Sequence, residues 1–473
     1  MVIFCVLAYF AITTGIGIYM MRQKSTLAGY FVAKKDLGPM LIIPLLFAEI
    51  IAGAGTVGNA AQAFKLGMSA VWVNWGMSIG CLVVMLTAAK FYRVIGNKVN
   101  AVSVPQIYNA RFDAKTRMVM MVVLVLVYAI LFAMQPVAAG NILSPLLGVD
   151  KTMITWFLGC LFIVLCITGG MKGMAWMNAL HTIVMYVGLG TVAFFAVKWA
   201  GGLENMQAAL PGTFFQFDQP DLLTMAGWVL GTVLSFFAAS VLIAGIFGAT
   251  NERAYKYGFS FAALLTFIFA LFPAIIGVVG AVMLPEAEGG SILYTVANSL
   301  GPVFAVLASM GILAAILSTG PALLLLTSTM LSEDVYQVFK KGASDEERLR
   351  FSRISMAVLG IAATYFGMHA GSILGQMAGA FQIRAIAGLV LLVAIFWPRV
   401  DSRAAFWSIL VGGLVAAVWH FAGNPYCTSL WPSLAVGVPI LLILTFMAPK
   451  PISDGYALYQ EAIKEQEAQG GIA

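Results

Sequence analysis

Long apolar segments alternate with short polar ones along almost the whole chain. A helix needs roughly 20 apolar residues to cross the hydrocarbon core of a bilayer, and most of these segments reach that length. The pattern therefore predicts an all-α integral membrane protein with about 13 transmembrane helices. The predicted spans are residues 2–21, 38–65, 68–92, 117–147, 152–170, 174–200, 222–249, 257–284, 301–331, 353–369, 372–398, 404–422 and 428–447.

The composition agrees with a membrane protein and excludes a soluble domain. Of the 473 residues, 61% are hydrophobic and only 10% are charged. Segment 2–21 is long enough to remain as a span, so we do not expect it to be a cleaved signal peptide. The loops between the predicted spans are too short to house a soluble catalytic domain. We therefore interpret the chain as one membrane domain.

The net charge of +6 reflects membrane topology and does not require an anionic partner. Loops on one side hold few basic residues, namely Lys65, Lys151 and Lys198, whereas loops on the other side hold many. By the positive-inside rule the basic side is cytoplasmic. We expect a multi-pass protein of the cell membrane with its N-terminus outside and its C-terminus in the cytoplasm. The lipid bilayer is its expected surrounding, and nucleic acid is not an expected partner.

The five cysteines are spread over the chain without a CxxC pair or a Cys/His cluster. This spacing argues against disulfides and against a transition-metal site. Buried thiols that fill apolar space are the better interpretation. We expect no organic cofactor.

The second predicted span contains features that are costly inside a bilayer. Its stretch LFAEIIAGAGTVG (46–58) carries the carboxylate of Glu49 and the glycines Gly53, Gly55 and Gly58. Glycine weakens a helix by about 1 kcal/mol relative to alanine, and a charge at bilayer depth needs a partner or water. One interpretation is that the glycines let the helix unwind. The alternative is close helix packing over small residues.

Another glycine-interrupted span, 222–249, begins five spans later. Interrupted spans at corresponding places in two halves are typical of inverted-repeat transporters. We predict a single transporter domain, 1–473, with a 5+5 inverted repeat and a broken first helix in each repeat. Its predicted parts are an extra N-terminal helix and loop (1–37), repeat one (38–200), repeat two (222–398), two C-terminal helices (399–447) and a cytoplasmic tail (448–473).

An unwound helix frees backbone carbonyls that can hold a cation. Span 301–331 adds the adjacent hydroxyls of Ser318 and Thr319. Taken alone, such hydroxyls are more typical of bonds to the carbonyl four residues earlier. Combined with a broken span, they predict an oxygen site without dense charge. Such a site suits a monovalent cation better than Ca²⁺ or Mg²⁺, which demand carboxylates.

Four motifs follow one another along nearly the whole chain. They are GYFVAKKDLGP (29–39), TGGMKGMAWMNAL (168–180), LAAILST with LSEDVY (313–319 and 331–336) and AIFWPR (394–399). In this order they resemble the sodium/solute symporter family. The resemblance implies the leucine-transporter-like inverted-repeat fold and solute uptake coupled to sodium. It also implies one Na⁺ held by the carbonyls of Ala48, Ile51 and Ala315 and the hydroxyls of Ser318 and Thr319, with Glu49 beside the site.

The sequence departs from the family pattern where some relatives hold a second sodium ion. Asn178 stands where the family often has aspartate, and Pro321 and Ala322 stand where further hydroxyls are expected. We therefore expect a single Na⁺ for each transport cycle.

Charges inside the membrane are candidates for function, and two lie deep in the predicted spans, Glu49 and Arg384. Arg384 would clamp the carboxylate of a solute, or it would form a structural ion pair with Glu49. Proton coupling through Glu49 is a further alternative. Other candidates for the solute site lie near the two breaks, where polar and aromatic groups could face a cavity. For these residues, interhelical hydrogen bonding or a position at the membrane interface is the competing interpretation. They are Gly53, Gly55, Thr56, Asn74, Trp75, Ser235, Phe236, Ser240 and Gln382.

These observations predict a sodium-coupled symporter that imports a small polar solute by alternating access. Because Arg384 needs an anion, we expect an organic acid or another metabolite with a carboxylate. The alternatives are a neutral solute such as a sugar, nucleoside or amide, or coupling to protons. A membrane enzyme is disfavoured, since no nucleophile with a base is suitably spaced, and the tail is too short for a sensor's signalling domain. A monomer suffices for this function, and an oligomer stays open.

Overall fold

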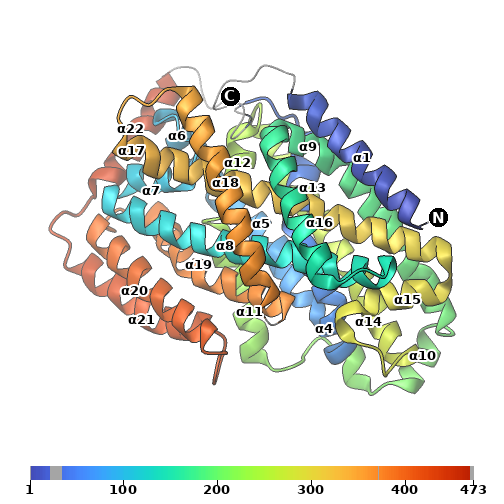
Figure 1. Ribbon diagram of the computed structural model, residues 1–473. Helices are drawn as coiled ribbons and strands as arrows, with labels where there is room; N and C mark the ends of the chain where they lie inside the picture. Colours follow the sequence, from blue (N-terminus) through green and yellow to red (C-terminus); the bar gives the residue numbers. More distant parts are fainter. Residues whose placement is uncertain (1, 22–32, 34, 371, 469–473) are drawn as a thin grey trace.

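The computed structural model describes residues 2–21, 33, 35–370 and 372–468, and these residues fold almost entirely into helices without a β-strand. Figure 1 shows the helices packed side by side in one bundle. An all-α membrane fold is thereby confirmed. Residues 29–32 and 34 of the GYFVAKKDLGP motif, and the last five residues of the tail, lie outside the described residues.

The helices of the first half are α1 (Val2–Met21), α3 (Pro39–Gly53), η1 (Ala54–Gly58), α4 (Asn59–Leu66), η2 (Gly67–Val71), α5 (Trp72–Thr87), α6 (Ala89–Lys98), α7 (Val104–Arg111), α8 (Ala114–Leu147), α9 (Lys151–Trp199), α10 (Leu203–Ala209) and η3 (Gly212–Phe215). Those of the second half are α11 (Leu222–Phe236), α12 (Ser240–Gly248), α13 (Glu252–Phe269), α14 (Leu271–Met283), η4 (Gly289–Ser291), α15 (Ile292–Leu300), α16 (Pro302–Met330), η5 (Leu331–Tyr336), α17 (Gln337–Phe339), α18 (Asp345–Met368), α19 (Ile373–Phe396), α20 (Ser402–Phe421), α21 (Leu430–Phe446) and α22 (Asp454–Ala468).

All thirteen predicted apolar segments are helical, and two of them are joined in α9. A straight helix of 49 residues would measure about 74 Å, more than twice the roughly 30 Å of a hydrocarbon core. Two apolar parts of α9, Lys151–Ile167 and Gly173–Trp199, therefore correspond to the two predicted spans. Within the described residues, length and composition alone qualify eight helices as spans, or nine with the bent pair α11–α12. The full count of thirteen stays a prediction.

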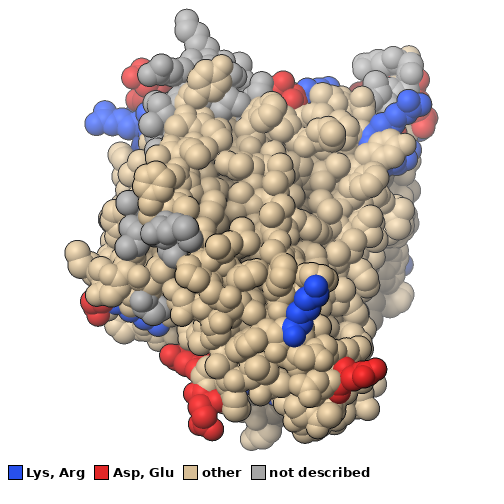
Figure 2. Space-filling view, turned by 90° about the vertical axis from the view of Figure 1, so that its right-hand side faces the viewer, with Lys and Arg blue, Asp and Glu red and all other residues tan. Residues whose placement is uncertain are grey.

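A broad face of the molecule is almost free of charged side chains, as Figure 2 shows, while charges gather above and below it. This is the surface that a protein crossing a bilayer requires. The end that carries α6, α17 and α22, uppermost in Figure 1, holds Lys98, Lys340 and Lys450 at or next to helix ends. We call it the basic end.

The first helix of each predicted repeat is broken, as expected. In α3 the break lies at Ala52, whose φ of 53° and ψ of 177° are not helical. A π-helical turn, η1, follows before the chain resumes as α4. In the second half, α11 and α12 meet at an angle of 40° across residues 237–239. Each broken helix is the first of five consecutive predicted spans. The boundaries of the two repeats stay a prediction.

The residue with positive φ at the break is Ala52 and not one of the glycines of LFAEIIAGAGTVG, while Gly55 and Gly58 lie in the π-helical turn that follows it. The glycines allow neighbours to approach. An added Cβ would lie 2.8 Å from the Ile316 side chain at Gly53, 3.1 Å from Asn74 at Gly55 and 3.1 Å from Leu374 at Gly58. The packing alternative therefore describes these glycines, and the strained backbone falls on a neighbouring alanine.

The two broken helices are joined at the basic end by main-chain hydrogen bonds. Leu37, just before α3, donates to the carbonyl of Gly248 at 2.8 Å and accepts from the N–H of Thr250 at 3.1 Å. This short parallel bridge connects the start of the first broken helix with the end of the second. The breaks themselves lie deeper, where α3 packs against α9, α13 and α16.

Helix α19 lies so close to α11 that one glycine has no room for a side chain. A Cβ at Gly388 would lie 1.8 Å from the backbone oxygen of Leu234. Replacing Gly388 by Ala forces the helices apart and should cost about 1–3 kcal/mol of unfolding free energy. We expect a lower temperature of thermal unfolding in detergent. The matched control is Gly413→Ala in α20, where the nearest atom is 3.7 Å from the added Cβ. Equal stability of the two variants would contradict the close approach.

Candidate functional site

Oxygen atoms from two helices gather where α3 breaks. The Ser318 hydroxyl lies 3.0 Å from the carbonyl oxygen of Ala48 and 2.8 Å from that of Ala315. The Thr319 hydroxyl lies 3.2 Å from each of the same two carbonyls, and the two hydroxyl oxygens are 3.4 Å apart. We call these four groups the oxygen cluster. All four residues are buried.

The break explains why the carbonyl of Ala48 is free at this point. The last four carbonyls of a helix lack partners in the helix, and Ala48 lies four residues before Ala52. The cluster has two hydroxyl protons for four contacts between a hydroxyl and a carbonyl, and every oxygen retains lone pairs. Such an excess of acceptors over donors is favourable for a cation. The fifth predicted ligand, the carbonyl of Ile51, accepts from the N–H of Ala54 across the break and has no described contact with the hydroxyls.

A cavity of about 50 Å³ lies next to the oxygen cluster, which reaches it through Thr319. Ala52 and Ala54 line it at the break, and Ala239 lines it near the bend of the second broken helix. Most of its wall is apolar. The charged and polar side chains that line it are Glu49, Tyr128, Gln135, Thr319 and Arg384.

Arg384 is a buried cation with only neutral partners in the described part of the chain. Its Nε donates to the hydroxyl of Ser235 at 2.8 Å. Its guanidinium carbon lies 5.5 Å from the ring centre of Tyr128 and 5.6 Å from that of Phe381. Ring faces attract a cation but do not neutralise it. The guanidinium therefore keeps an uncompensated positive charge at the cavity.

Glu49 is the carboxyl side chain at the same cavity. Its carboxyl is buried, and one of its oxygens, Oε1, has no hydrogen-bond partner among the described residues. The amide of Asn178 is the polar group that faces it from α9. Glu49 and Arg384 line the same cavity but form no ion pair within the described chain. The described residues thus lack the structural ion pair that is the alternative to a solute clamp.

Of the other predicted solute residues, only Phe236 lines the cavity. The side chain of Ser235 is joined to it through Arg384. Ser240 lies close by, where its N–H donates to the hydroxyl of Tyr128 at 2.6 Å, and its side chain lines a smaller space instead.

The remaining candidates hold the structure around the break. The N–H of Gly53 donates to Gln135 at 3.0 Å, and Asn74 donates to the carbonyl of Gly55 at 2.9 Å. The Thr56 hydroxyl bonds carbonyls of its own turn. Trp75 and Gln382 lie elsewhere: Trp75 stacks on Phe217 and Phe267, and Gln382 accepts from Ser429. Interhelical bonding is therefore the observed role of Asn74.

Tyr128 and Gln135 are cavity residues that the sequence interpretation missed. They lie seven residues apart in α8 and are its polar side chains toward the break. Positions seven apart share one helix face, so two polar groups in an otherwise apolar stretch were a usable signal. Their exact partners, Ser240 and Gly53, belong to other helices and are not visible in the sequence.

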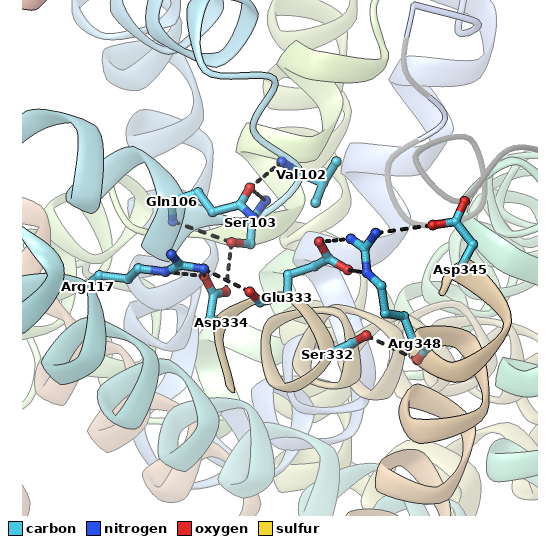
Figure 3. Close-up of polar contacts among 9 residues, drawn as sticks. All are labelled: Val102, Ser103, Gln106, Arg117, Ser332, Glu333, Asp334, Asp345 and Arg348. Atoms are coloured by element: carbon cyan, nitrogen blue, oxygen red, sulfur yellow. Dashed lines mark hydrogen bonds and ion pairs between the residues drawn. The ribbon is translucent and has the colours of Figure 1, made fainter. Parts of the chain in front are cut away.

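Charged side chains meet beyond the end of α16, as Figure 3 shows. Arg117 of α8 lies 2.7 Å from Asp334 and also donates to the backbone carbonyl of Glu333 at 2.8 Å. Ser103, which caps α7, donates to Asp334 at 2.8 Å. Arg348 of α18 forms an ion pair with Glu333. We call these five residues the η5 network, because both carboxylates belong to η5.

A much smaller space, about 10 Å³, lies between the cavity and the η5 network. Leu326 lines both this space and the cavity. Ser103, a member of the η5 network, lines the small space, as does Ser240. We expect a path from the cavity toward the basic end to pass through this small space and to meet the ion pairs of the η5 network.

Comparison with known proteins matches nearly the whole chain to membrane transporters. The sequence model of the sodium:solute symporter family matches residues 30–412. The high-affinity proline transporter PutP of Bacillus subtilis is 24% identical, over 95% of this chain and 99% of that protein. The sodium/proline symporter of Haemophilus influenzae is also 24% identical, over 95% of each chain.

Solved structures with low sequence identity share the fold. A substrate-bound, outward-open Na⁺-coupled sialic acid symporter superposes with a TM-score of 0.79 at 19% identity, over 95% of this chain and 97% of that chain. Mhp1, a nucleobase-cation-symport-1 family transporter, superposes in a closed conformation with a TM-score of 0.63 at 15% identity, over 91% and 97% of the two chains. These similarities confirm the five-plus-five inverted-repeat fold with broken first helices.

The η5 network should hold the path to the basic end closed. In a variant whose native cysteines are replaced, Ser240→Cys places a thiol at the small space. Adding Asp334→Asn removes the charge that pairs with Arg117, and breaking a buried pair is costly. We expect a membrane-impermeant thiol reagent to label the cysteine roughly tenfold faster or more.

The control is Asp345→Asn, which removes an exposed carboxylate that pairs with Arg348 at 3.2 Å. Its labelling rate should stay at the level of the parent protein. Equal rates with and without Asp334→Asn, in protein that unfolds at the same temperature, would show that the network does not block the path.

Proposed function

Because the chain belongs to the sodium:solute symporter family, a family of transporters and not of enzymes, we propose that it is a Na⁺-coupled symporter of a small zwitterionic amino acid. The observation that carries the proposal is the cavity beside the oxygen cluster. It contains one uncompensated cation and one carboxylate with a free oxygen, and these two groups form no ion pair with each other.

The oxygen cluster supports one Na⁺. Neutral oxygens from the broken α3 and from α16 converge there, and hard oxygen donors without dense charge suit an alkali cation. A monovalent ion would offset the excess of lone pairs. We propose Ile51 as a further ligand, since its carbonyl belongs to the same last turn before the break. At the position proposed for a second ion, Asn178 offers a neutral amide, which supports a single Na⁺.

The solute would use the two charges of the cavity. The carboxylate of an amino acid matches the guanidinium of Arg384, whose planar fork favours such a partner. Its ammonium group matches the free oxygen of Glu49. The small volume and apolar wall favour a compact solute with little polar side chain. Relatives named as proline transporters support proline, or an amino acid of similar size, as the first solute to test.

Alternating access would follow from the surroundings of the cavity. The η5 network would form the barrier toward the basic end, and we propose that this end faces the cytoplasm, as the positive-inside rule requires. Sodium binding would hold α3 against α16 through the oxygen cluster. A monomer contains every group that this cycle uses.

Removing the two hydroxyls should weaken Na⁺ binding. We expect Ser318→Ala with Thr319→Val to raise the Na⁺ concentration for half-maximal uptake roughly tenfold or more, since hydrogen-bond partners of a charge contribute about 1.5–3 kcal/mol each. Thr327→Val is the matched control, because Thr327 of the same helix bonds only the carbonyl of Leu323. Uptake is measured in proteoliposomes at constant pH.

The parent protein should show a Hill coefficient for Na⁺ near one, and uptake should cease without Na⁺. A coefficient near two would contradict the single ion. Uptake that follows a proton gradient in the absence of Na⁺ would favour proton coupling through Glu49.

Binding of solute analogues should reveal the two charged contacts separately. The probes are proline, pyrrolidine, which lacks the carboxylate, and tetrahydrofuran-2-carboxylate, which lacks the amine. We expect Arg384→Lys to weaken proline about thirtyfold or more, as for one partner of a buried charge pair, and to leave pyrrolidine unaffected. Glu49→Gln should weaken proline but not tetrahydrofuran-2-carboxylate. Equal losses for all three probes would indicate that the residues act on the fold and not on the solute.

A further inference from the structure

A large cavity of the described chain lies apart from the candidate site, at the basic end. Its volume is about 850 Å³. It is bordered by the junction of α7 and α8, the start of α20, and the segment between α21 and α22. None of the residues that line it belongs to the oxygen cluster, the solute cavity or the η5 network. Nothing in the proposed transport cycle uses this space.

One wall of the cavity contains a buried cation without a counter-charge. Arg111 is only 1% exposed. It donates to the carbonyls of Ala394 and Val400 and to the hydroxyl of Ser453, at 2.8–3.2 Å. All of these partners are neutral, and within the described residues no carboxylate pairs with it. A desolvated charge without a counter-ion is unfavourable, so an anion in the cavity would stabilise it.

The other charges at the cavity leave a positive surplus. Lys115 and Arg403 are exposed and have no ion pair among the described residues. Lys450 is paired with Asp454 at 2.7 Å. The two remaining carboxylates, Asp113 and Asp401, are occupied by the N–H groups at the starts of α8 and α20. The four cations and three carboxylates of the lining therefore leave one net positive charge. Arg111, Lys115 and Arg403 are the cations that form no ion pair among the described residues.

The surroundings indicate where such an anion would come from. Trp407 and Met118 line the cavity and are 47% and 39% exposed, and Phe446 nearby on α21 is 63% exposed. Large apolar side chains that remain exposed on membrane helices face lipid, and tryptophan favours the level of the headgroups. Such a combination of basic and exposed apolar side chains is typical of the level in a bilayer where phosphate groups meet acyl chains.

We propose that this cavity binds the phosphate headgroup of an anionic membrane phospholipid. The phosphate would lie between Lys115 and Arg403, near Arg111, and the acyl chains would lie along Trp407 and Met118. Basic pockets between transmembrane helices recognise lipid headgroups by this combination of charge and apolar surface. The bound lipid would connect α8 of the transport core with α20, which lies outside both repeats.

The proposal is tested on the full-length protein in nanodiscs that contain equal amounts of phosphatidylglycerol and phosphatidylcholine with the same acyl chains. After release from the nanodisc, native mass spectrometry counts the lipids that the protein retains. We expect phosphatidylglycerol to be retained in preference to phosphatidylcholine. Lys115→Gln with Arg403→Gln should lower the ratio of bound phosphatidylglycerol roughly thirtyfold, since each basic residue near the headgroups contributes separately.

The matched control is Arg350→Gln with Arg353→Gln. Both residues are exposed on α18, outside the cavity, and the change in net charge is the same. Retention by this variant should equal that of the parent protein. An equal loss in both double variants would mean that net charge alone attracts the lipid, and the proposal would be wrong. Equal retention of the two lipids by the parent protein would overturn it without any variant.

A soluble anion is the other source of a phosphate. Detergent-solubilised protein is therefore heated with inorganic phosphate, with glycerol 3-phosphate or with phosphatidylglycerol. Only the lipid should raise the unfolding temperature, and the rise should disappear in Lys115→Gln with Arg403→Gln. The same rise with either soluble phosphate would identify a soluble anion as the ligand and contradict the lipid site.

Discussion

The break in α3 at Ala52 is the constraint on which the rest of the site depends. A helix that stops within the membrane leaves backbone carbonyls and N–H groups without partners, and hydrocarbon offers none. Here other helices supply them: Ser318 and Thr319 of α16 meet the carbonyl of Ala48, and Gln135 of α8 meets the N–H of Gly53. Each of these bonds also brings a second helix to the cavity. The hydrogen bonds that satisfy the broken backbone therefore also assemble the site.

The charged side chains are arranged differently at three depths of the molecule. In the middle of the bundle, Glu49 and Arg384 stay apart around a cavity. Toward the basic end, the carboxylates of η5 are paired with Arg117 and Arg348. Near the surface, the cations around Arg111 exceed the available carboxylates. Paired charges hold helices together. An uncompensated buried charge is instead stabilised when a ligand of opposite charge binds beside it, because a buried charge needs a partner.

Much of the fold was predictable because the bilayer imposes a strong pattern on the sequence. The apolar segments, both broken helices and the pairing of Ser318 and Thr319 with α3 follow from hydrophobicity, small residues and the family resemblance. The position of the break at Ala52 does not, since alanine has no intrinsic preference for a positive φ. The solute residues were harder to identify. Three of the candidates are polar or aromatic residues near a break, but tertiary packing gives them partners outside the cavity. Trp75 bonds Phe267, Gln382 bonds Ser429, and Asn74 bonds Gly55. Tyr128 reaches the cavity because α8 crosses it, which no local pattern reveals.

The main-chain bridge at Leu37 has a mechanical consequence. It fastens the leading end of one broken helix to the trailing end of the other through Gly248 and Thr250. Main-chain hydrogen bonds do not depend on side-chain identity. We therefore expect this connection to persist in most variants with a substitution in either segment of the bridge. Any tilt of one of these half-helices about its break, at Ala52 or at residues 237–239, would therefore pull on the other half-helix through the bridge.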